Sequence, residues 1–207
     1  MWFLSAGTTF LFYNVYLYAN KFFPMPKITL KQIAFLFGLI LLVTSCGTQR
    51  TASSSLYNPK QVAELSNKLG IELKNTDKED DKNIPLYAEA SLWLGTPYRY
   101  GGLSKKGVDC SGLTYLLYQK VYKKKIPRST ADLSKMNMQK VSKSNLRAGD
   151  LVFFTTNSSH KKINHVGIYL KDNRFIHAST SRGVVVDRLD QGYYSRKDVW
   201  KMGGRIK

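Results

Sequence analysis

The hydrophobic periodicity of this chain changes once, from helical to strand-like, between residues 84 and 207. Residues 86–94 and 111–122 place apolar side chains three and four positions apart, which predicts two helices, and a third, short helix is expected after Pro127. Runs rich in β-branched and aromatic residues follow, and they predict strands at residues 150–154, 165–170, 174–179, 183–189 and 204–206. Because helices come first and antiparallel strands later, we expect a segregated α+β fold rather than alternating βαβ units.

The residues before this region have the features of an export signal. Residues 32–45 are uncharged, follow two lysines and end at Cys46, and the run is short for a membrane span. Its last residues resemble the lipobox at which bacterial lipoprotein signals are cleaved before the cysteine is lipidated. We therefore interpret residues 25–45 as a lipoprotein signal and residues 1–24 as an extension upstream of the true start. A plain signal anchor is the alternative.

The chain between this signal and the folded domain is predicted to be a tether. A polar stretch follows Cys46, residues 59–69 have the spacing of one amphipathic helix, and residues 75–83 form a charged linker. We therefore assign residues 46–83 to a lipidated tether with a short helix and a linker, and residues 84–207 to the folded domain.

The chain is strongly basic: 32 Lys and Arg against 14 Asp and Glu give a formal net charge of +18. Such an excess indicates polyanionic surroundings, which can be nucleic acid, anionic lipid or an acidic wall polymer. A merely solubilising surface is the alternative. The lysine clusters at residues 123–125 and 161–162 lie in predicted loops, whereas a nucleic-acid interface would gather basic and aromatic residues on one face. General attraction to an acidic wall fits better, and no nucleic-acid partner is expected.

Cys46 and Cys110 are the only cysteines, so lipidation of the first would leave the second without an intramolecular disulfide partner. Cys110 stands directly before an apolar-periodic helix, where unpaired backbone N–H groups and the helix dipole favour a thiolate and can hold an oxyanion. A packing role is the alternative, but Gly107 and Gly112 flank the position and its immediate neighbours are polar. The sequence therefore predicts a reactive cysteine.

Two of the three histidines are expected to meet on neighbouring strands. His165 begins one predicted strand and His177 lies within the next, whereas His160 falls in a polar loop and is interpreted as solvated. A three-residue turn at residues 171–173 would place both imidazoles on one face as diagonal neighbours, and a two-residue turn would separate them. Asn173 suits the left-handed position that a three-residue hairpin needs. The pattern therefore predicts a cysteine–imidazole–imidazole relay.

Short motifs along the chain, taken in order, resemble those of the NlpC/p60 family. They are LGTPYRYGG at 94–102, DCSG at 109–112, PRST at 127–130, AGDLVF at 148–153, HVGIY at 165–169 and FIHAS at 175–179. Within the family, the chain is most similar to the small outer-membrane lipoprotein endopeptidases. The resemblance implies a papain-like α+β fold and hydrolysis of amide bonds in peptidoglycan stem peptides or cross-links, through an acyl-enzyme and without a cofactor or metal. Which of these bonds is cut stays open.

The resemblance also implies roles for individual residues. Cys110 would be the nucleophile and His165 the general base, while His177 would orient that base and the Tyr98 hydroxyl would help to bind the oxyanion. The signal run and the lipobox-like residues before Cys46 predict an exported protein that is lipid-anchored in the cell envelope, and the outer membrane facing the periplasm is the expected location. A non-catalytic lipoprotein that only binds the sacculus is the alternative function.

Three further polar residues are candidates for substrate binding. They are Asp109, Ser111 and Arg128. In some relatives the polar residues beside the cysteine hold a free amine of the stem peptide, and Arg128 could hold a carboxylate. A helix cap at Asp109 or Ser111 and a structural ion pair at Arg128 are equally compatible with the sequence.

The working form is expected to carry lipid on Cys46 and to lack residues 1–45, because an uncharged run and small residues precede that cysteine and a polar tether follows it. Intact mass and fatty-acid labelling of protein isolated from its native host measure both features. A soluble protein without Cys46, or an unlabelled one that still carries residues 25–45, would exclude the tether and leave the cysteine chemistry untouched.

Overall fold

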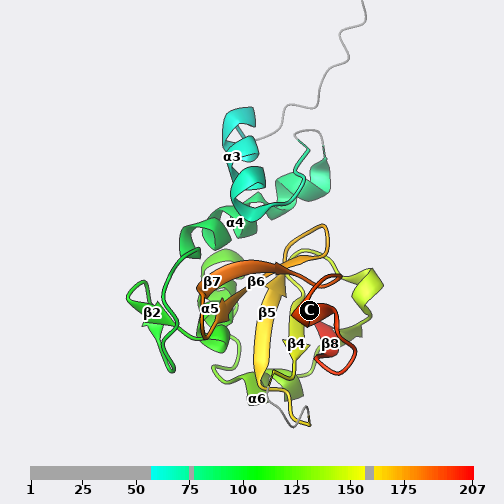
Figure 1. Cartoon of the computed structure of the whole chain (residues 1–207). Coiled ribbons are helices and arrows are strands. Elements are labelled where there is room, and N and C mark those ends of the chain that lie inside the picture. Colours follow the sequence, from blue (N-terminus) through cyan, green and yellow to red (C-terminus); the bar gives the residue numbers. More distant parts are fainter. Residues whose placement is uncertain (1–56, 75–76, 157–160) are drawn as a thin grey trace, which may run out of the picture. The chain divides into compact units, whose positions relative to one another are not determined.

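The computed structural model describes residues 57–74, 77–156 and 161–207 (Figure 1). The predicted signal, Cys46 and His160 lie outside these residues. Helices come first and an antiparallel sheet follows, so the expected α+β fold is confirmed. No helix of the described part is long and apolar enough to cross a membrane.

Helix α3 spans Pro59–Leu69, as the sequence predicts. The Asn58 side chain accepts a hydrogen bond from the Lys60 N–H at its start, and Gly70 ends it in the left-handed conformation, with a φ of 65°. The helix packs on the next one, α4, and its buried apolar side chains belong to the main hydrophobic core. The segment before residue 84 is therefore part of the same packed unit as the sheet.

Helix α4 spans Lys78–Trp93, so it begins inside the stretch 75–83 that the sequence predicts as a linker. Asp77 caps it by accepting a hydrogen bond from the Glu79 N–H at 2.9 Å, and the acidic residues of the first turn interact favourably with the helix dipole. The helix continues through Pro85. The charged stretch is thus a helix N-terminus, and the boundary expected between residues 83 and 84 falls inside a helix.

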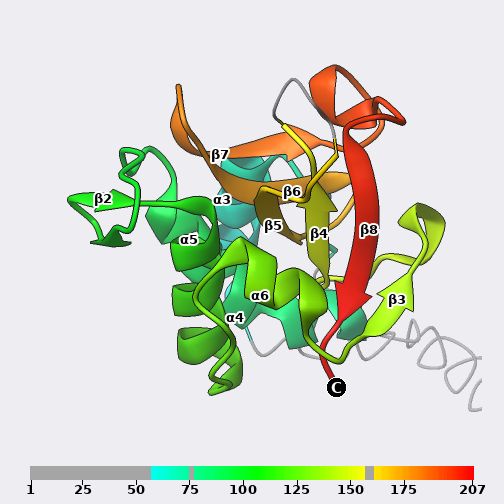
Figure 2. The ribbon, with the colours of Figure 1, turned by 90° about the horizontal axis from the view of Figure 1, so that it is seen from below.

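Helix α5 spans Cys110–Leu117 and continues as a π-helical turn, η1, over Tyr118–Tyr122. Together they cover the single helix predicted at residues 111–122, with a change of pitch near its middle. Before α5 lies a small antiparallel hairpin that the sequence did not predict, and it projects from the side of the domain in Figure 2. Its strands are β1, Leu103–Ser104, and β2, Gly107–Val108.

Six strands form one antiparallel sheet in the order β3-β8-β4-β5-β6-β7. Their bounds are β3 Gln139–Val141, β4 Leu151–Phe154, β5 His165–Tyr169, β6 Arg174–Ser179, β7 Gly183–Arg188 and β8 Trp200–Arg205. The predictions for β4 to β7 are confirmed to within a residue, β8 begins earlier than expected, and β3 was not predicted. The short edge strand β3 depends on its pairing with β8, which lies far away in the sequence.

Helices α4 and α5 lie on one side of the sheet, as Figure 2 shows, and α5 packs against β5 and β6. The main core between these layers includes Leu113 and Leu117 of α5 together with Val166, Ile168 and Ile176 of the strands. Because side chains alternate along a strand, the other face carries a second, smaller cluster. It is made of Val152, Phe154, Phe175, Leu189 and Val199.

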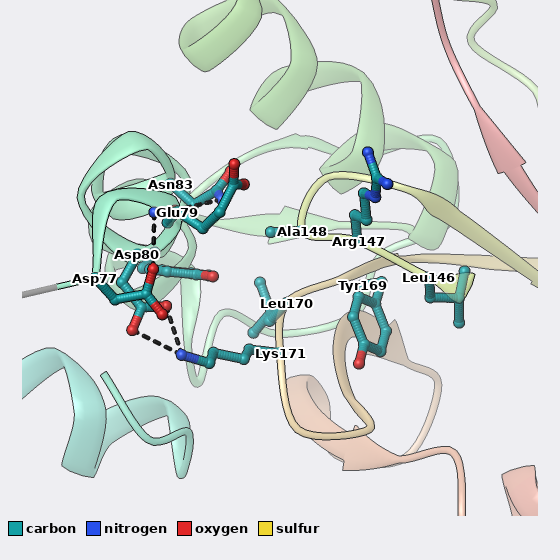
Figure 3. Close-up of a pocket in the computed structure, with 11 residues that line it drawn as sticks. Asp77, Glu79, Asp80, Asn83, Leu146, Arg147, Ala148, Tyr169, Leu170 and Lys171 are labelled. Atoms are coloured by element: carbon teal, nitrogen blue, oxygen red, sulfur yellow. Dashed lines mark hydrogen bonds and ion pairs between the residues drawn. The ribbon is translucent and has the colours of Figure 1, made fainter. Parts of the chain in front are cut away.

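The three-residue turn between β5 and β6 is held by contacts from outside the sheet. Asp172 and Asn173 have positive φ values of 53° and 58°, so the left-handed conformation predicted for Asn173 is confirmed. Lys171 Nζ lies 2.6 Å from both carboxylate oxygens of the buried Asp80 in α4, beside a cavity of about 450 Å³ (Figure 3). Asp172 accepts a hydrogen bond from the Glu72 N–H at 2.6 Å. These two contacts anchor the turn to the helical layer.

Replacing Lys171 with methionine is expected to lower the free energy of unfolding by about 2–3 kcal/mol, because it leaves the carboxylate of Asp80 buried without its cation. Lys74→Met is the matched control, since Lys74 pairs with Glu72 at a distance of 3.7 Å on an exposed surface. The control should change the same quantity by less than about 0.5 kcal/mol. Urea unfolding of the purified variants measures both, and equal effects would contradict the anchoring of the turn.

Candidate active site

Asp109 sets the start of α5 and thereby the position of Cys110. Its backbone is extended, with φ of −95° and ψ of 174°, and its Oδ1 accepts a hydrogen bond from the Gly112 N–H at 2.6 Å. Its Oδ2 accepts another from the Gly101 N–H at 2.7 Å. One carboxylate therefore caps the helix and holds the preceding loop, and Cys110 becomes the first helical residue.

Arg128 completes this cluster. Its terminal nitrogens lie 2.8 and 2.9 Å from the two oxygens of Asp109, and Nη1 also donates to Ser111 Oγ at 2.9 Å. Burial alone would raise the pKa of Asp109, but hydrogen bonds from Arg128 and from two backbone N–H groups hold that pKa below its ordinary value. The sequence left open whether these residues serve the fold or bind substrate. The geometry supports the roles in the fold, which are a helix cap at Asp109 and an ion pair at Arg128. Substrate contacts by Asp109, Ser111 and Arg128 stay a prediction.

The Cys110 side chain is buried, with 8% of its surface exposed. Its Sγ lies 3.6 Å from Oγ1 of Thr130, the first residue of α6 (Thr130–Lys135), which is capped by Ser129. Burial raises the pKa of the thiol, although hydrogen bonds from the Thr130 hydroxyl and the Val166 N–H act in the opposite direction. A helix start was expected to favour the thiolate. Burial is the largest contribution to this pKa and raises it above the ordinary value, so the group is a thiol at neutral pH.

His165 and His177 meet as the sequence predicts. The register of β5 and β6 puts His177 opposite Gly167 and makes the two histidines diagonal neighbours on one face. Nε2 of His165 lies 2.8 Å from Nδ1 of His177, and the two rings are perpendicular, at 89°. A Cβ at Gly167 would lie only 2.7 Å from the carbonyl oxygen of Ile176, so glycine permits this close approach of the strands.

Aromatic rings enclose the two imidazoles. Phe175 stacks on His177 with ring centroids 4.9 Å apart, and Tyr194 of the 3-10 helix η3 (Tyr193–Ser195) lies 5.0 Å from His177 and 6.0 Å from His165. Burial lowers the pKa of both imidazoles, and that of His165 falls well below its usual value. Both rings are therefore neutral at neutral pH, and each keeps one nitrogen able to accept a proton.

Cys110 lies near the histidines, at the end of β5. The backbone N–H of Val166 acts on the pKa of the thiol and therefore lies close to Sγ, and His165 directly precedes Val166 as the first residue of the strand. Because side chains alternate along β5, Val166 faces α5 whereas His165 faces the aromatic rings. The thiol thus sits beside the strand end from which the imidazole projects.

A cleft of about 580 Å³ opens over Cys110. Tyr98 and the strongly exposed Tyr100 line it together with residues of the Asp109–Arg128 cluster. The pKa of Tyr98 is raised by its burial first and then by the charge of the nearby Cys110 thiolate form. The structure therefore brings Tyr98, Cys110 and the three candidate substrate-binding residues to one cleft.

Comparison with known proteins agrees with this geometry. The profile of the NlpC/P60 family matches residues 95–202, slightly more than half of the chain. The chain belongs to the NlpC/P60 family. All four residues predicted to take part in the chemistry, Tyr98, Cys110, His165 and His177, lie within the matched span.

Relatives within the NlpC/P60 family cover most of the chain. The "probable endopeptidase NlpC homolog" of Haemophilus influenzae is 36% identical over 180 residues, which are 81% of this chain and 94% of the relative. The "murein DD-endopeptidase MepS/murein LD-carboxypeptidase" of Escherichia coli (strain K12) is 34% identical over 177 residues, 84% of this chain and 92% of the relative. The crystal structure of an NlpC/P60 family protein from Bacillus cereus superposes with a TM-score of 0.53 at 31% identity, covering 59% of this chain and 39% of that protein.

Sequence reasoning missed three residues of this NlpC/P60 site. Thr130 contacts the thiol and Tyr194 covers the imidazoles, but their positions depend on how α6 and η3 fold over the sheet. Asp187 Oδ2 lies 3.0 Å from His177 Nε2, and Arg182 donates to both oxygens of that carboxylate. The sequence held a signal for Asp187, because a three-residue turn after β6 puts it on the same face as His177.

Both imidazoles are expected to remain neutral as the pH falls below 6.5, the usual pKa of histidine, because burial penalises the imidazolium form. Titration of ¹⁵N-labelled histidine by NMR measures this directly. An unfolded chain takes up these protons near pH 6.5, so the stability that the neutral rings contribute is present above that pH and is lost below it. Titration of His165 or His177 at or above pH 6.5 would contradict the burial argument.

Proposed function

We propose that the chain is a peptidoglycan hydrolase, a cysteine endopeptidase that cleaves amide bonds in the stem peptides or cross-links of the bacterial cell wall. The observation that carries this proposal is a helix-start thiol, Cys110, beside the hydrogen-bonded pair His165 and His177. Membership of the NlpC/P60 family supports the substrate class. The open cleft over the thiol supports a polymeric substrate that approaches from solvent.

In the first step, Cys110 passes its proton to His165 while Sγ attacks the scissile carbonyl carbon. The thiol pKa is raised and the imidazole pKa is lowered, so the resting pair is neutral. The resulting tetrahedral oxyanion would be stabilised by the Cys110 backbone N–H and by the hydroxyl of Tyr98.

The second half of the cycle uses the same groups in reverse. His165 gives its proton to the leaving amine, which departs and leaves a thioester on Cys110. His165 next takes a proton from water while the water oxygen attacks the thioester carbon. The carbon–sulfur bond then breaks, the carboxylate product leaves, and Cys110 Sγ takes the proton back from His165. His177 does not exchange a proton with the substrate in this scheme. It orients the His165 ring through the 2.8 Å hydrogen bond.

The proposed site of action is the cell envelope. Lipid on Cys46 would hold the protein at a membrane, with the outer membrane facing the periplasm as the expected location, and residues 47–58 would link the anchor to α3. In the same scheme residues 84–207 are the catalytic domain, with α3 and the first turns of α4 packed on it. The positive charge of the chain suits attraction to an acidic wall.

Cys110→Ala and His165→Ala are each expected to reduce peptidoglycan digestion by at least about 10³-fold, because nucleophile and base act as one unit. Purified sacculi, with mass analysis of the released fragments, give the rate and identify the bond that is cut. His160→Ala is the control, because it removes the third histidine, which the sequence predicts to lie in a solvated loop. Undiminished turnover in Cys110→Ala would refute the proposal. Binding of the wild-type protein to sacculi with no released fragment would favour the non-catalytic lipoprotein.

A further inference from the structure

Three side chains on three neighbouring strands form a continuous hydrogen-bonded row. His165 on β5 contacts His177 on β6 at 2.8 Å, and the far nitrogen of His177 contacts Asp187 on β7 at 3.0 Å. Each step joins diagonal neighbours on one face of the sheet. Arg182, in the turn between β6 and β7, donates to both oxygens of Asp187. The row therefore ends in a carboxylate that is itself held in place.

The chemistry of this end group sets the direction of every hydrogen bond in the row. An ionised carboxylate only accepts, so Nε2 of His177 must carry the proton that it shares with Asp187. A neutral imidazole has one N–H, so Nδ1 of His177 accepts, and Nε2 of His165 must donate to it. The remaining nitrogen of His165, Nδ1, then holds a free lone pair.

We propose that Asp187, held by Arg182, is a positioning residue that selects the tautomers of His177 and His165, so that Nδ1 of His165 is the nitrogen that accepts the proton of Cys110. The inference rests on the proposed function for its role in the reaction. The tautomers themselves can be measured without any substrate.

The opposite assignment of the two N–H protons shows why a residue that fixes the tautomers is needed. If Nδ1 of His177 carried the proton, it would donate to Nε2 of His165, and the proton of His165 would move to Nδ1. His165 would then have no lone pair for the thiol and could not act as a base. In a serine-protease triad, an Asp-to-Asn change that leaves the imidazole in the wrong tautomer lowers kcat by about 10⁴-fold. In this protein the carboxylate of Asp187 acts on the base His165 through one further imidazole, that of His177.

Arg182 keeps Asp187 in the ionised form that the row requires. Burial alone would raise the pKa of the Asp187 carboxyl, but the hydrogen bonds from His177 and Arg182 hold it well below its ordinary value. The carboxylate consequently does not take the proton from His177 when His165 becomes imidazolium. It stabilises that positive charge through the row, and the proton stays on His165 for delivery to the leaving amine.

Three titratable or charged groups surround the two imidazoles from the elements packed around them: Asp187 of β7, Arg182 of the β6–β7 turn and Tyr194 of η3. The Cys110 thiol of α5 acts in turn on the pKa of Tyr194. The negative charge of Asp187 raises the pKa of His177, and the positive charge of Arg182 lowers it. Removing the first charge should therefore shift the acid limb of the pH–rate profile to lower pH, and removing the second should shift it to higher pH.

The decisive variant is Asp187→Asn, which keeps the shape of the side chain but can donate as well as accept. It should lower kcat by about 10- to 100-fold with little change in KM. Losses of this size are typical when an enzyme loses a residue that orients a metal-binding side chain through a hydrogen bond. Its acid limb should move to lower pH, and ¹⁵N NMR should show His177 protonated on Nδ1 in part of the molecules. Arg182→Gln should cost less activity and move the acid limb to higher pH.

Asp190→Asn and Arg188→Gln are matched controls, because this neighbouring ion pair, with nitrogen and oxygen 2.6 Å apart, lies on the surface and is separate from the row. Neither should change the tautomers or kcat. The proposal is overturned if Asp187→Asn keeps the wild-type tautomers, or if its acid limb rises toward pH 6.5, which would indicate water entering a loosened site. Wild-type protein that shows the expected tautomers but releases no peptidoglycan fragments would refute the proposed function and leave the inference standing.

Discussion

The register of the β5–β6 hairpin is the constraint on which the site depends. A slip of one residue would turn His177 to the opposite face and break its hydrogen bond with His165. The register is set by a three-residue turn with two left-handed residues and by a glycine that lets the strands approach. The contact of Lys171 with Asp80 ties this turn to the N-terminus of α4. A helix remote from the cleft therefore helps to keep the imidazoles aligned.

Burial is the second organising effect, and it acts in opposite directions on the two partners of the proposed proton transfer. It raises the pKa of the Cys110 thiol and lowers that of the His165 imidazole, since each charged form is penalised when it leaves water. The thiol and the imidazole are consequently both uncharged at neutral pH, although the chain as a whole is strongly basic.

The cluster of Asp109, Ser111 and Arg128 shows how one group can support several elements. The carboxylate of Asp109 caps α5, holds the preceding loop and binds Arg128 through both oxygens. Its oxygens are thus occupied within the protein, on the wall of the same cleft that Cys110 lines. The need to position the nucleophile is enough to explain why these three polar residues stand here. A contact with substrate would be an additional role of the same groups.

The amino-acid sequence by itself determined the features that depend on short-range periodicity and turn chemistry. Strands β4 to β7, helix α3, and the same-face pairing of His165 and His177 all follow from spacing along the chain and from the residues of one turn. Charge patterns were less informative: the charged stretch 75–83 has the composition of a linker, yet α4 begins inside it with Asp77 as its cap. Only the tertiary structure decided the pairing of β3 with β8, the cover of Tyr194 over the imidazoles and the protonation of Cys110. These properties depend on which distant segments exclude water from a group, and local sequence does not contain that information.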